Sequence, residues 1–337
     1  MRDSAAYNIV VTNDCMIRCG HCFMDRKAVK SLSVDTVNAI TAKILSFNKS
    51  QDINWGGGEP LILGRGYLRG MVSLACFEDP GTRNLLYSTY QIQLDNDWVD
   101  ILNRFDALMF SIDSYRSAQT NFSSGLALSN LKRLSPEKHV SYTPMVGDTP
   151  EKVAGYYAQA LDLGAEMFHL GFLYSRKLIP PGTYIRLIDD LMDLQVSLDG
   201  PEIGFFHKSQ ACGGDYKSAV GWRGYDCFDK GMYFSHDGIV TPCFIMYSLG
   251  FDVPHVKIGE FLSEDTDIFD LNRKYAAEFF IRSREGKCLE CSYYTLCMGG
   301  CPYFTARSEK TGIDCYCEVY KRIFETLLGR NHREVCA

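Results

Sequence analysis

Hydrophobic and polar positions follow two alternating patterns along the first 200 residues. Short runs rich in β-branched and aromatic residues predict six strands, at residues 7–12, 52–55, 84–89, 107–112, 139–146 and 167–173. Longer segments between them, such as residues 34–47, carry apolar side chains at helical spacing. A helix is expected to begin at Pro150, because Thr149 can cap it and Pro150 suits its first turn. Strands that alternate with helices are typical of parallel βα units, so we expect an α/β fold with helices covering a parallel sheet.

The pattern changes in the second half of the chain. Beyond Leu194 the sequence becomes rich in glycine, cysteine and turn residues, and helical spacing returns only at residues 316–328. We therefore expect two domains, residues 1–200 and 201–337, the second organised by metal ligation more than by a large apolar core.

Composition narrows the function classes. The chain has 337 residues, of which 46% are hydrophobic, so it can bury a full core. Its net charge of -6 and the lack of a basic run disfavour a nucleic-acid partner. No segment is apolar and long enough for a signal peptide or a membrane span, so we expect a cytoplasmic protein without a membrane partner.

Cysteine is the unusual component, with 14 residues in the chain. In a reducing compartment so many thiols indicate metal binding more than disulfides. Three of them lie close together near the N-terminus and ten follow residue 211, which predicts two separate metal-binding regions. Cys76 stands apart in a helical run and is expected to be a small buried side chain.

The N-terminal cysteines Cys15, Cys19 and Cys22 form a CxxxCxxC loop directly after the first predicted strand. Ligand sites of α/β folds collect at this end of the strands. Three thiolates can bind three irons of a [4Fe–4S] cluster and leave the fourth iron open. A structural zinc site with His21 as fourth ligand is the alternative, although common zinc motifs have other spacings.

A second motif, WGGGEP, ends the second predicted strand, and its glycines allow backbone to approach a ligand closely. The two segments together resemble the radical S-adenosylmethionine superfamily, whose CxxxCxxC loop and GGEP segment they match. The resemblance covers the first domain and implies a partial (β/α)6 TIM-like barrel. It also implies a [4Fe–4S] cluster whose open iron binds S-adenosylmethionine, which is cleaved to a 5′-deoxyadenosyl radical.

The same resemblance assigns cofactor-binding residues. It implies that the backbone of Gly57, Gly58 and Glu59 binds the methionyl amino group and that His21 lies near the adenine. Ser111, on the fourth strand, resembles the polar strand end that meets the ribose or the methionyl carboxylate. An ordinary strand-ending turn explains Ser111 equally well.

The cysteines after residue 211 begin with Cys227-x10-Gly238-x4-Cys243 and continue as CxxCx5CxxxC. This series resembles the SPASM domain, the auxiliary-cluster domain of peptide-modifying radical enzymes. The resemblance implies three [4Fe–4S] clusters in all. The first auxiliary cluster would be bound by Cys227, Cys243 and Cys301. The second would be bound by Cys288, Cys291, Cys297 and a final cysteine.

Two ligands of these clusters are open to alternatives. For the final cysteine, Cys317 fits the family stretch before a Tyr-Lys pair better than Cys315 does. Cys212 is favoured as the fourth ligand of the first auxiliary cluster, and an iron without a protein ligand is the alternative. CxxC pairs also occur in zinc ribbons, a reading that the N-terminal triad disfavours.

Auxiliary clusters can accept the electron left on a substrate or position that substrate, which favours oxidative chemistry. We expect a ribosomally made peptide to be oxidatively modified or cross-linked, with oxidation of a small molecule such as a sugar-derived alcohol as the alternative. A noncatalytic iron–sulfur scaffold would not need the N-terminal motifs. A sulfatase-maturating role is disfavoured, because Phe244 instead of an acidic base follows Cys243.

The expected partners follow from this chemistry. An electron donor of the flavodoxin or ferredoxin type is expected, since the cluster must be reduced before it can cleave the cofactor. Only fourteen residues precede Cys15. A leader peptide is therefore expected to bind the barrel directly or to arrive with a separate recognition protein. No catalytic base is assigned.

Overall fold

The computed structural model describes thirteen segments of the chain, and its packing divides them into two compact units. The described residues are 5–19, 22–25, 28–47, 51–112, 122–171, 179–198, 200–203, 231–263, 273–274, 277, 288–297, 299–308 and 315–329. The first unit combines Met1–His139 with Lys230–Asn272, and the second combines Val140–Asp229 with Arg273–Ala337. The predicted domain boundary near residue 200 stays a prediction.

All six predicted strands are present, with their ends shifted by a few residues. They are β1 (Ala5–Thr12), β2 (Gln51–Gly57), β3 (Thr82–Tyr87), β4 (Ala107–Ser111), β5 (Glu137–Tyr142) and β6 (Met167–Leu170). In the first unit β1 pairs in parallel with β2, β2 with β3, and β3 with β4. In the second unit β6 pairs in parallel with the short β7 (Glu202–Ile203).

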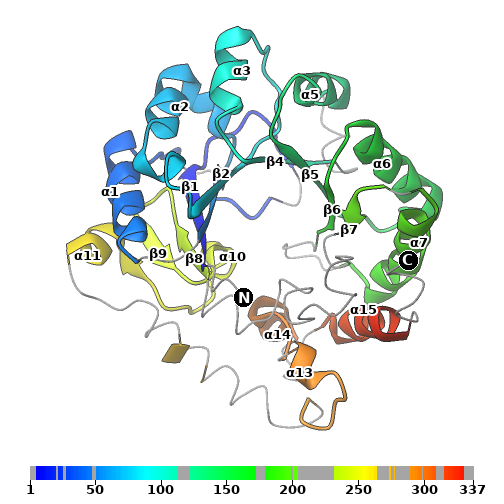
Figure 1. Cartoon of the computed structure of the whole chain (residues 1–337). Helices are drawn as coiled ribbons and strands as arrows, with labels where there is room; N and C mark the ends of the chain where they lie inside the picture. Colours follow the sequence, from blue (N-terminus) through cyan, green and yellow to red (C-terminus); the bar gives the residue numbers. More distant parts are fainter. Residues whose placement is uncertain are drawn as a thin grey trace. The chain divides into compact units, whose positions relative to one another are not determined.

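Helices connect the strands of the first unit, as expected for parallel βα units (Figure 1). They are α1 (Val34–Leu45), α2 (Gly64–Val72), α3 (Asn96–Leu102) and α5 (Ser124–Leu131), with the 3-10 helices η1 (Pro60–Leu63) and η2 (Ala75–Phe77) on either side of α2. Ser33 caps α1 by accepting a hydrogen bond from the Thr36 amide at 3.1 Å. The expected helix 34–47 is therefore confirmed, two residues shorter at its C-terminal end.

Alternation along β2 separates the two faces of the sheet. Ile53 and Trp55 are fully buried, and Trp55 stacks on Phe77 of η2 at 5.8 Å between ring centroids. The Trp55 indole also donates to Asn84 Oδ1 at 3.0 Å. Asn54, which points to the opposite face, is only half-buried. The buried face of the sheet thus combines apolar side chains with the buried amides of Gln51 and Asn84, and the other face is partly exposed.

A strand from the second half of the sequence extends the sheet of the first unit. The sequence analysis did not predict this strand. β8 (Gly231–Phe234) pairs in parallel with β1, and β9 (Ile239–Thr241) and β10 (Val256–Lys257) continue antiparallel. Met232 and Phe234 are fully buried. β8 therefore contributes apolar side chains to the core of the first unit. The expectation that metal ligation organises residues 201–337 more than a large apolar core stays a prediction.

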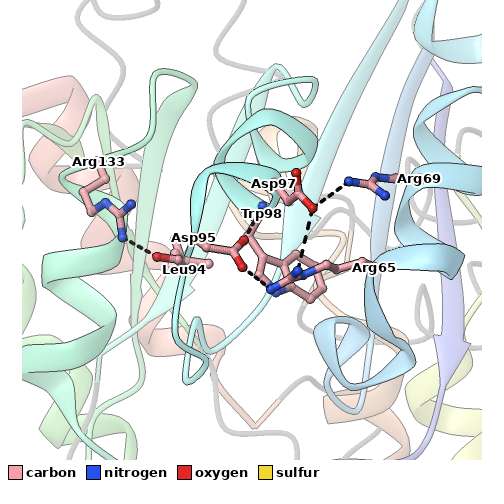
Figure 2. Close-up of polar contacts among 7 residues, drawn as sticks. All are labelled: Arg65, Arg69, Leu94, Asp95, Asp97, Trp98 and Arg133. Carbon is pink, nitrogen blue, oxygen red and sulfur yellow. Dashed lines mark hydrogen bonds and ion pairs between the residues drawn. The ribbon is translucent and has the colours of Figure 1, made fainter.

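Exposed charged residues link α2 to α3 (Figure 2). Arg65 pairs with Asp95, which caps α3, and the Arg65 guanidinium lies 5.7 Å above the centroid of the Trp98 ring. Asp97 accepts from Arg69 at 2.9 Å. These side chains are about half exposed, so each pair contributes at most about 1 kcal/mol.

In the second unit three long helices pack together: α6 (Pro150–Asp162), α7 (Pro181–Leu198) and α15 (Cys317–Gly329). Thr149 caps α6 as predicted, and α15 confirms the helix expected at residues 316–328. Arg322 of α15 donates to both carboxylate oxygens of Asp189 in α7, at 3.1 and 2.8 Å. Within the described residues, no helix combines the length and the hydropathy that a membrane span needs.

Candidate functional site

The CxxxCxxC loop leaves the C-terminal end of β1, the position predicted for it. Cys15, Cys19 and Cys22 are each half-buried. The Cys15 amide donates to Asp14 Oδ1 at 2.9 Å, and the Cys22 amide donates to the Cys19 carbonyl at 3.1 Å. His21 lies outside the described residues, so its predicted place near adenine stays a prediction.

The residue types in this loop fit an iron–sulfur cluster. Three thiols within eight residues can bind three irons. Among the residues that the structure describes, no three Cys, His, Asp or Glu side chains already converge at metal-binding distances. The ligand set of Cys15, Cys19 and Cys22 is therefore an assignment from residue type and spacing.

The GGE segment packs directly on the start of the cysteine loop. The Gly58 amide donates to the Thr12 carbonyl and the Glu59 amide to the Asp14 carbonyl, both at 2.7 Å. A Cβ atom on Gly57 would lie 2.2 Å from the Thr12 oxygen, and one on Gly58 would lie 2.0 Å from the Asp14 oxygen. Only glycine allows this approach. Two motifs more than thirty residues apart thus become one backbone unit.

Gly57 has a second requirement, because its φ of 136° is a conformation that other residues rarely adopt. The amides of Gly58 and Glu59 already donate hydrogen bonds, and the Glu59 carbonyl accepts one from the Ile62 amide at 3.1 Å. Each carbonyl oxygen of this segment has two lone pairs and can accept a further hydrogen bond. Carbonyl oxygens accept hydrogen bonds, so they suit the amino group that the family resemblance places here.

The Glu59 side chain is fully buried and holds the site together. Its carboxylate accepts from Ser88 Oγ at 2.7 Å, from the Leu61 amide at 3.1 Å and from the Thr89 amide at 2.8 Å, and the Thr89 hydroxyl also donates to it. Four donors leave the carboxylate no obvious capacity for a cofactor. Its role in this structure is to fix the GGE backbone to the end of β3.

Ser88 and Thr89 are site residues that the sequence analysis did not single out. The available signal was their position, since two hydroxyl residues directly follow an apolar run at a strand end. Tyr90 comes next, with a φ of 52°, and it is fully buried. Burial and the nearby Glu59 raise the pKa of Tyr90 well above its usual value, so its hydroxyl stays protonated.

Ser111 is the last residue of β4 and is half-buried. The preceding strand residues are buried, so Ser111 is where β4 begins to emerge from the core. This position agrees equally with contact to the ribose or the methionyl carboxylate and with an ordinary strand-ending turn. Contact with a cofactor therefore stays a prediction.

Cysteines of the second unit lie on short turns. The Cys291 amide donates to the Cys288 carbonyl at 3.2 Å, and the Cys297 amide donates to the Tyr293 carbonyl at 2.9 Å. Cys317 is the first residue of α15, and burial raises its pKa to about 11. Lys321 lowers this pKa, whereas Glu318, Cys288 and Cys291 raise it. Cys288 and Cys291 are thus close enough to act on the charge of Cys317, and its ligand role stays a prediction.

Cys243 belongs to the first unit, where it precedes α10 (Phe244–Ser248). Burial raises the pKa of its thiol to about 11. Phe244 packs edge-on against Phe23, with ring centroids 6.0 Å apart, so the residues that follow Cys243 and Cys22 are in contact. Cys301 directly precedes α14 (Pro302–Arg307) in the second unit and makes no capping hydrogen bond with its side chain. Cys212 and Cys227 lie outside the described residues.

Cys76 is fully buried, which confirms the expectation that it packs as a small side chain. Burial raises the pKa of its thiol to about 12. It therefore serves as a reference cysteine away from the predicted ligand sets.

No protein-family profile matches the sequence. Among solved structures, native anSMEcpe with bound AdoMet and Kp18Cys peptide superposes with a TM-score of 0.76 at 16% identity, over 98% of this chain and 99% of that chain. Streptococcus suis SuiB bound to its precursor peptide SuiA superposes with a TM-score of 0.66 at 14% identity, over 94% of this chain and 75% of that chain. These similarities confirm the predicted α/β partial-barrel fold with a further C-terminal region.

Proposed function

We propose that this protein is a radical S-adenosylmethionine enzyme that abstracts hydrogen from a ribosomally made peptide, which is then oxidatively modified or cross-linked. The observation that carries the proposal is the pair of 2.7 Å hydrogen bonds joining Gly58 to Thr12 and Glu59 to Asp14. They put a backbone suited to an amino group beside a loop of three thiols. Neither a zinc site nor a scaffold needs that pairing.

The chain's own residues divide the work at this site. Cys15, Cys19 and Cys22 would hold the cluster, and the backbone of Gly57, Gly58 and Glu59 would bind the methionyl amino group of the cofactor. His21 is assigned to the adenine and Ser111 to the ribose or the methionyl carboxylate. With both groups bound, a reduced [4Fe–4S] cluster supplies the electron that cleaves S-adenosylmethionine to a 5′-deoxyadenosyl radical.

A peptide substrate is supported by the two similar structures, since one is recorded with Kp18Cys peptide and the other with the precursor peptide SuiA. Oxidation of a small molecule is the second candidate, because the same cofactor chemistry would serve it. We assign electron supply to a flavodoxin or ferredoxin. A short open reading frame beside the gene would favour a peptide, and sugar-tailoring neighbours would favour the small molecule.

Two auxiliary [4Fe–4S] clusters complete the proposed enzyme. The second auxiliary cluster is the better supported, because Cys288 and Cys291 are close enough to Cys317 to act on its charge. Its proposed ligands are Cys288, Cys291, Cys297 and Cys317. The proposed ligands of the first are Cys212, Cys227, Cys243 and Cys301.

The test is anaerobic reconstitution of the full chain with iron and sulfide, followed by reduction in the presence of S-adenosylmethionine. Wild-type protein is expected to carry about twelve irons and to form 5′-deoxyadenosine. Replacing Cys15, Cys19 and Cys22 together with alanine should remove about four irons and abolish the product. Cys76→Ala is the matched control and should retain both.

Two results would contradict the proposal. Persistent 5′-deoxyadenosine in the triple variant would show that the loop is not where the cofactor is cleaved. A wild-type iron content near four would rule out the two auxiliary clusters, and the N-terminal cluster would still be supported.

A further inference from the structure

Three consecutive residues, Thr12, Asn13 and Asp14, connect the cysteine loop to the GGE segment. We refer to them as the junction. The carbonyls of Thr12 and Asp14 accept the hydrogen bonds from Gly58 and Glu59. The side chains of Thr12 and Asn13 bind the far end of the cysteine loop, whereas Asp14 Oδ1 accepts from the Cys15 amide at its start.

Asn13 makes most of those contacts. It is 2% exposed, and its side-chain nitrogen donates to the carbonyls of Asp25 and Ala28, each at 2.8 Å. Its side-chain oxygen accepts from the Lys30 amide at 2.8 Å, and its backbone amide donates to the Lys30 carbonyl at 3.2 Å. Both donors and the acceptor of the amide are therefore used, all on the returning end of the loop.

Thr12 supports the same closure. Its hydroxyl donates to the Lys30 carbonyl at 3.2 Å and accepts from Ser31 Oγ at 2.8 Å and from the Asp14 amide at 3.0 Å. The loop that carries all three cysteines is thus closed at its base between residues 13 and 30. The same base is bonded through its carbonyls to the GGE backbone.

We propose that Asn13 is a positioning residue that keeps the cysteine loop in register with Gly58 and Glu59, so that an open iron and the amino-binding carbonyls face one cofactor molecule. This inference rests on the proposed function and deepens it. A neutral amide is the side chain that supplies two donors and one acceptor in this geometry. An aspartate would still accept the hydrogen bond from the Lys30 amide. Its second carboxylate oxygen has no proton to donate and would face the carbonyl oxygens of Asp25 and Ala28, which repel it.

Asn13→Asp leaves the three thiols unchanged, so the cluster is expected to assemble with altered placement. The reconstituted full-length variant should hold as much iron as the wild type. Addition of S-adenosylmethionine should change the electron paramagnetic resonance spectrum of the reduced cluster only at a concentration at least about tenfold higher than the wild type needs. Formation of 5′-deoxyadenosine should fall about 10- to 100-fold, as expected for a small misplacement of reacting groups.

Asn84→Asp is the matched control. Asn84 is also 2% exposed and has its amide bonded at both ends, to the Cys76 carbonyl and the Trp55 indole, each at 3.0 Å. This variant should lose comparable stability and keep the wild-type spectral response to S-adenosylmethionine. Ser31→Ala, which removes one bond from Thr12, should shift that response in the same direction as Asn13→Asp, by less.

The outcomes separate the two proposals. If S-adenosylmethionine does not change the electron paramagnetic resonance spectrum of the wild-type cluster, the proposed function and this inference are both wrong. A normal response in Asn13→Asp, or an equal shift in Asn84→Asp, would overturn the role of Asn13 alone. Loss of iron from both Asn13→Asp and Ser31→Ala would also overturn it, because these residues would then be needed for cluster assembly and not for register.

Discussion

Gly57, Gly58 and Glu59 show how single residues define the candidate site. The two glycines are required where one backbone runs against another, at Thr12 and Asp14. Glu59 is required because Ser88, Thr89 and Leu61 all donate to a carboxylate that is fully buried. Removing a buried acceptor with several donors costs more than the average hydrogen bond is worth. The motif therefore has a structural role beside the cofactor-binding role that we propose for it.

Gly58→Ala is expected to separate the GGE segment from the cysteine loop, because its Cβ would lie 2.0 Å from the Asp14 oxygen. Formation of 5′-deoxyadenosine should fall at least about tenfold while the iron content stays close to that of the wild type. Gly66→Ala is the matched control, since no atom lies within 4 Å of its Cβ position in α2. Equal activity of the two variants would argue against the close approach.

Among the elements, β5 shows why a predicted strand ended early. The prediction ran to residue 146, whereas β5 ends at Tyr142. Asp148 accepts from the Tyr142 hydroxyl at 2.5 Å and from the Met145 amide at 2.8 Å, which turns the chain toward α6. Lys152 of α6 pairs with the same carboxylate at 2.8 Å. One buried acid therefore ends the strand and helps to begin the helix.

Asp148→Asn should lower the free energy of unfolding by about 1–3 kcal/mol at neutral pH. Burial would raise the pKa of Asp148, but hydrogen bonds from Lys152, Tyr142 and the Met145 amide hold it below its ordinary value. The carboxylate therefore stabilises the fold above about pH 4, and this contribution is lost as pH falls through the folded-state pKa.

Urea unfolding of the wild type and of Asp148→Asn between pH 7 and pH 3, followed by circular dichroism, measures this contribution. The difference between the two proteins should shrink as the pH falls. Glu325→Gln is the control, because Glu325 is 49% exposed in its pair with Arg322 and should change stability by less than about 1 kcal/mol. A difference that is constant across this pH range would exclude the charged form as its source.

At the scale of the whole molecule, the family resemblance of the cysteine series implies three clusters, and α15 provides a direct test of the ligand sets. Cys315 and Cys317 are two residues apart, on either side of the buried Tyr316. The Tyr316 hydroxyl accepts from the Ile179 amide at 3.1 Å and donates to the Ile179 carbonyl at 2.9 Å. This anchoring fixes where α15 begins and places Cys317 in its first turn.

Cys317→Ala is expected to lower the iron content by about four per chain, whereas Cys315→Ala should keep about twelve. Iron and sulfide analysis after anaerobic reconstitution distinguishes them. Both variants should still form 5′-deoxyadenosine, because the N-terminal loop is unchanged in each. The reverse pattern of iron loss would assign the final ligand to Cys315.

Local features of this protein can be predicted from its sequence. Periodicity placed six strands and the longer helices, Thr149 marked the start of α6, and cysteine spacing with GGEP indicated the chemistry. Such features depend on neighbouring residues, so a single sequence reveals them. The ends of strands depend on contacts beyond the strand itself. Asp148, for example, ends β5 through hydrogen bonds that span a turn.

Only the tertiary structure decided which distant segments meet. It placed β8 beside β1, Ser88 and Thr89 on Glu59, and Asn13 across the base of the cysteine loop. Hydrogen bonds between backbones far apart in the chain leave little trace in local periodicity, since any strand end could supply the same carbonyls. The junction of the cysteine loop with the GGE segment is therefore a property of the folded sheet.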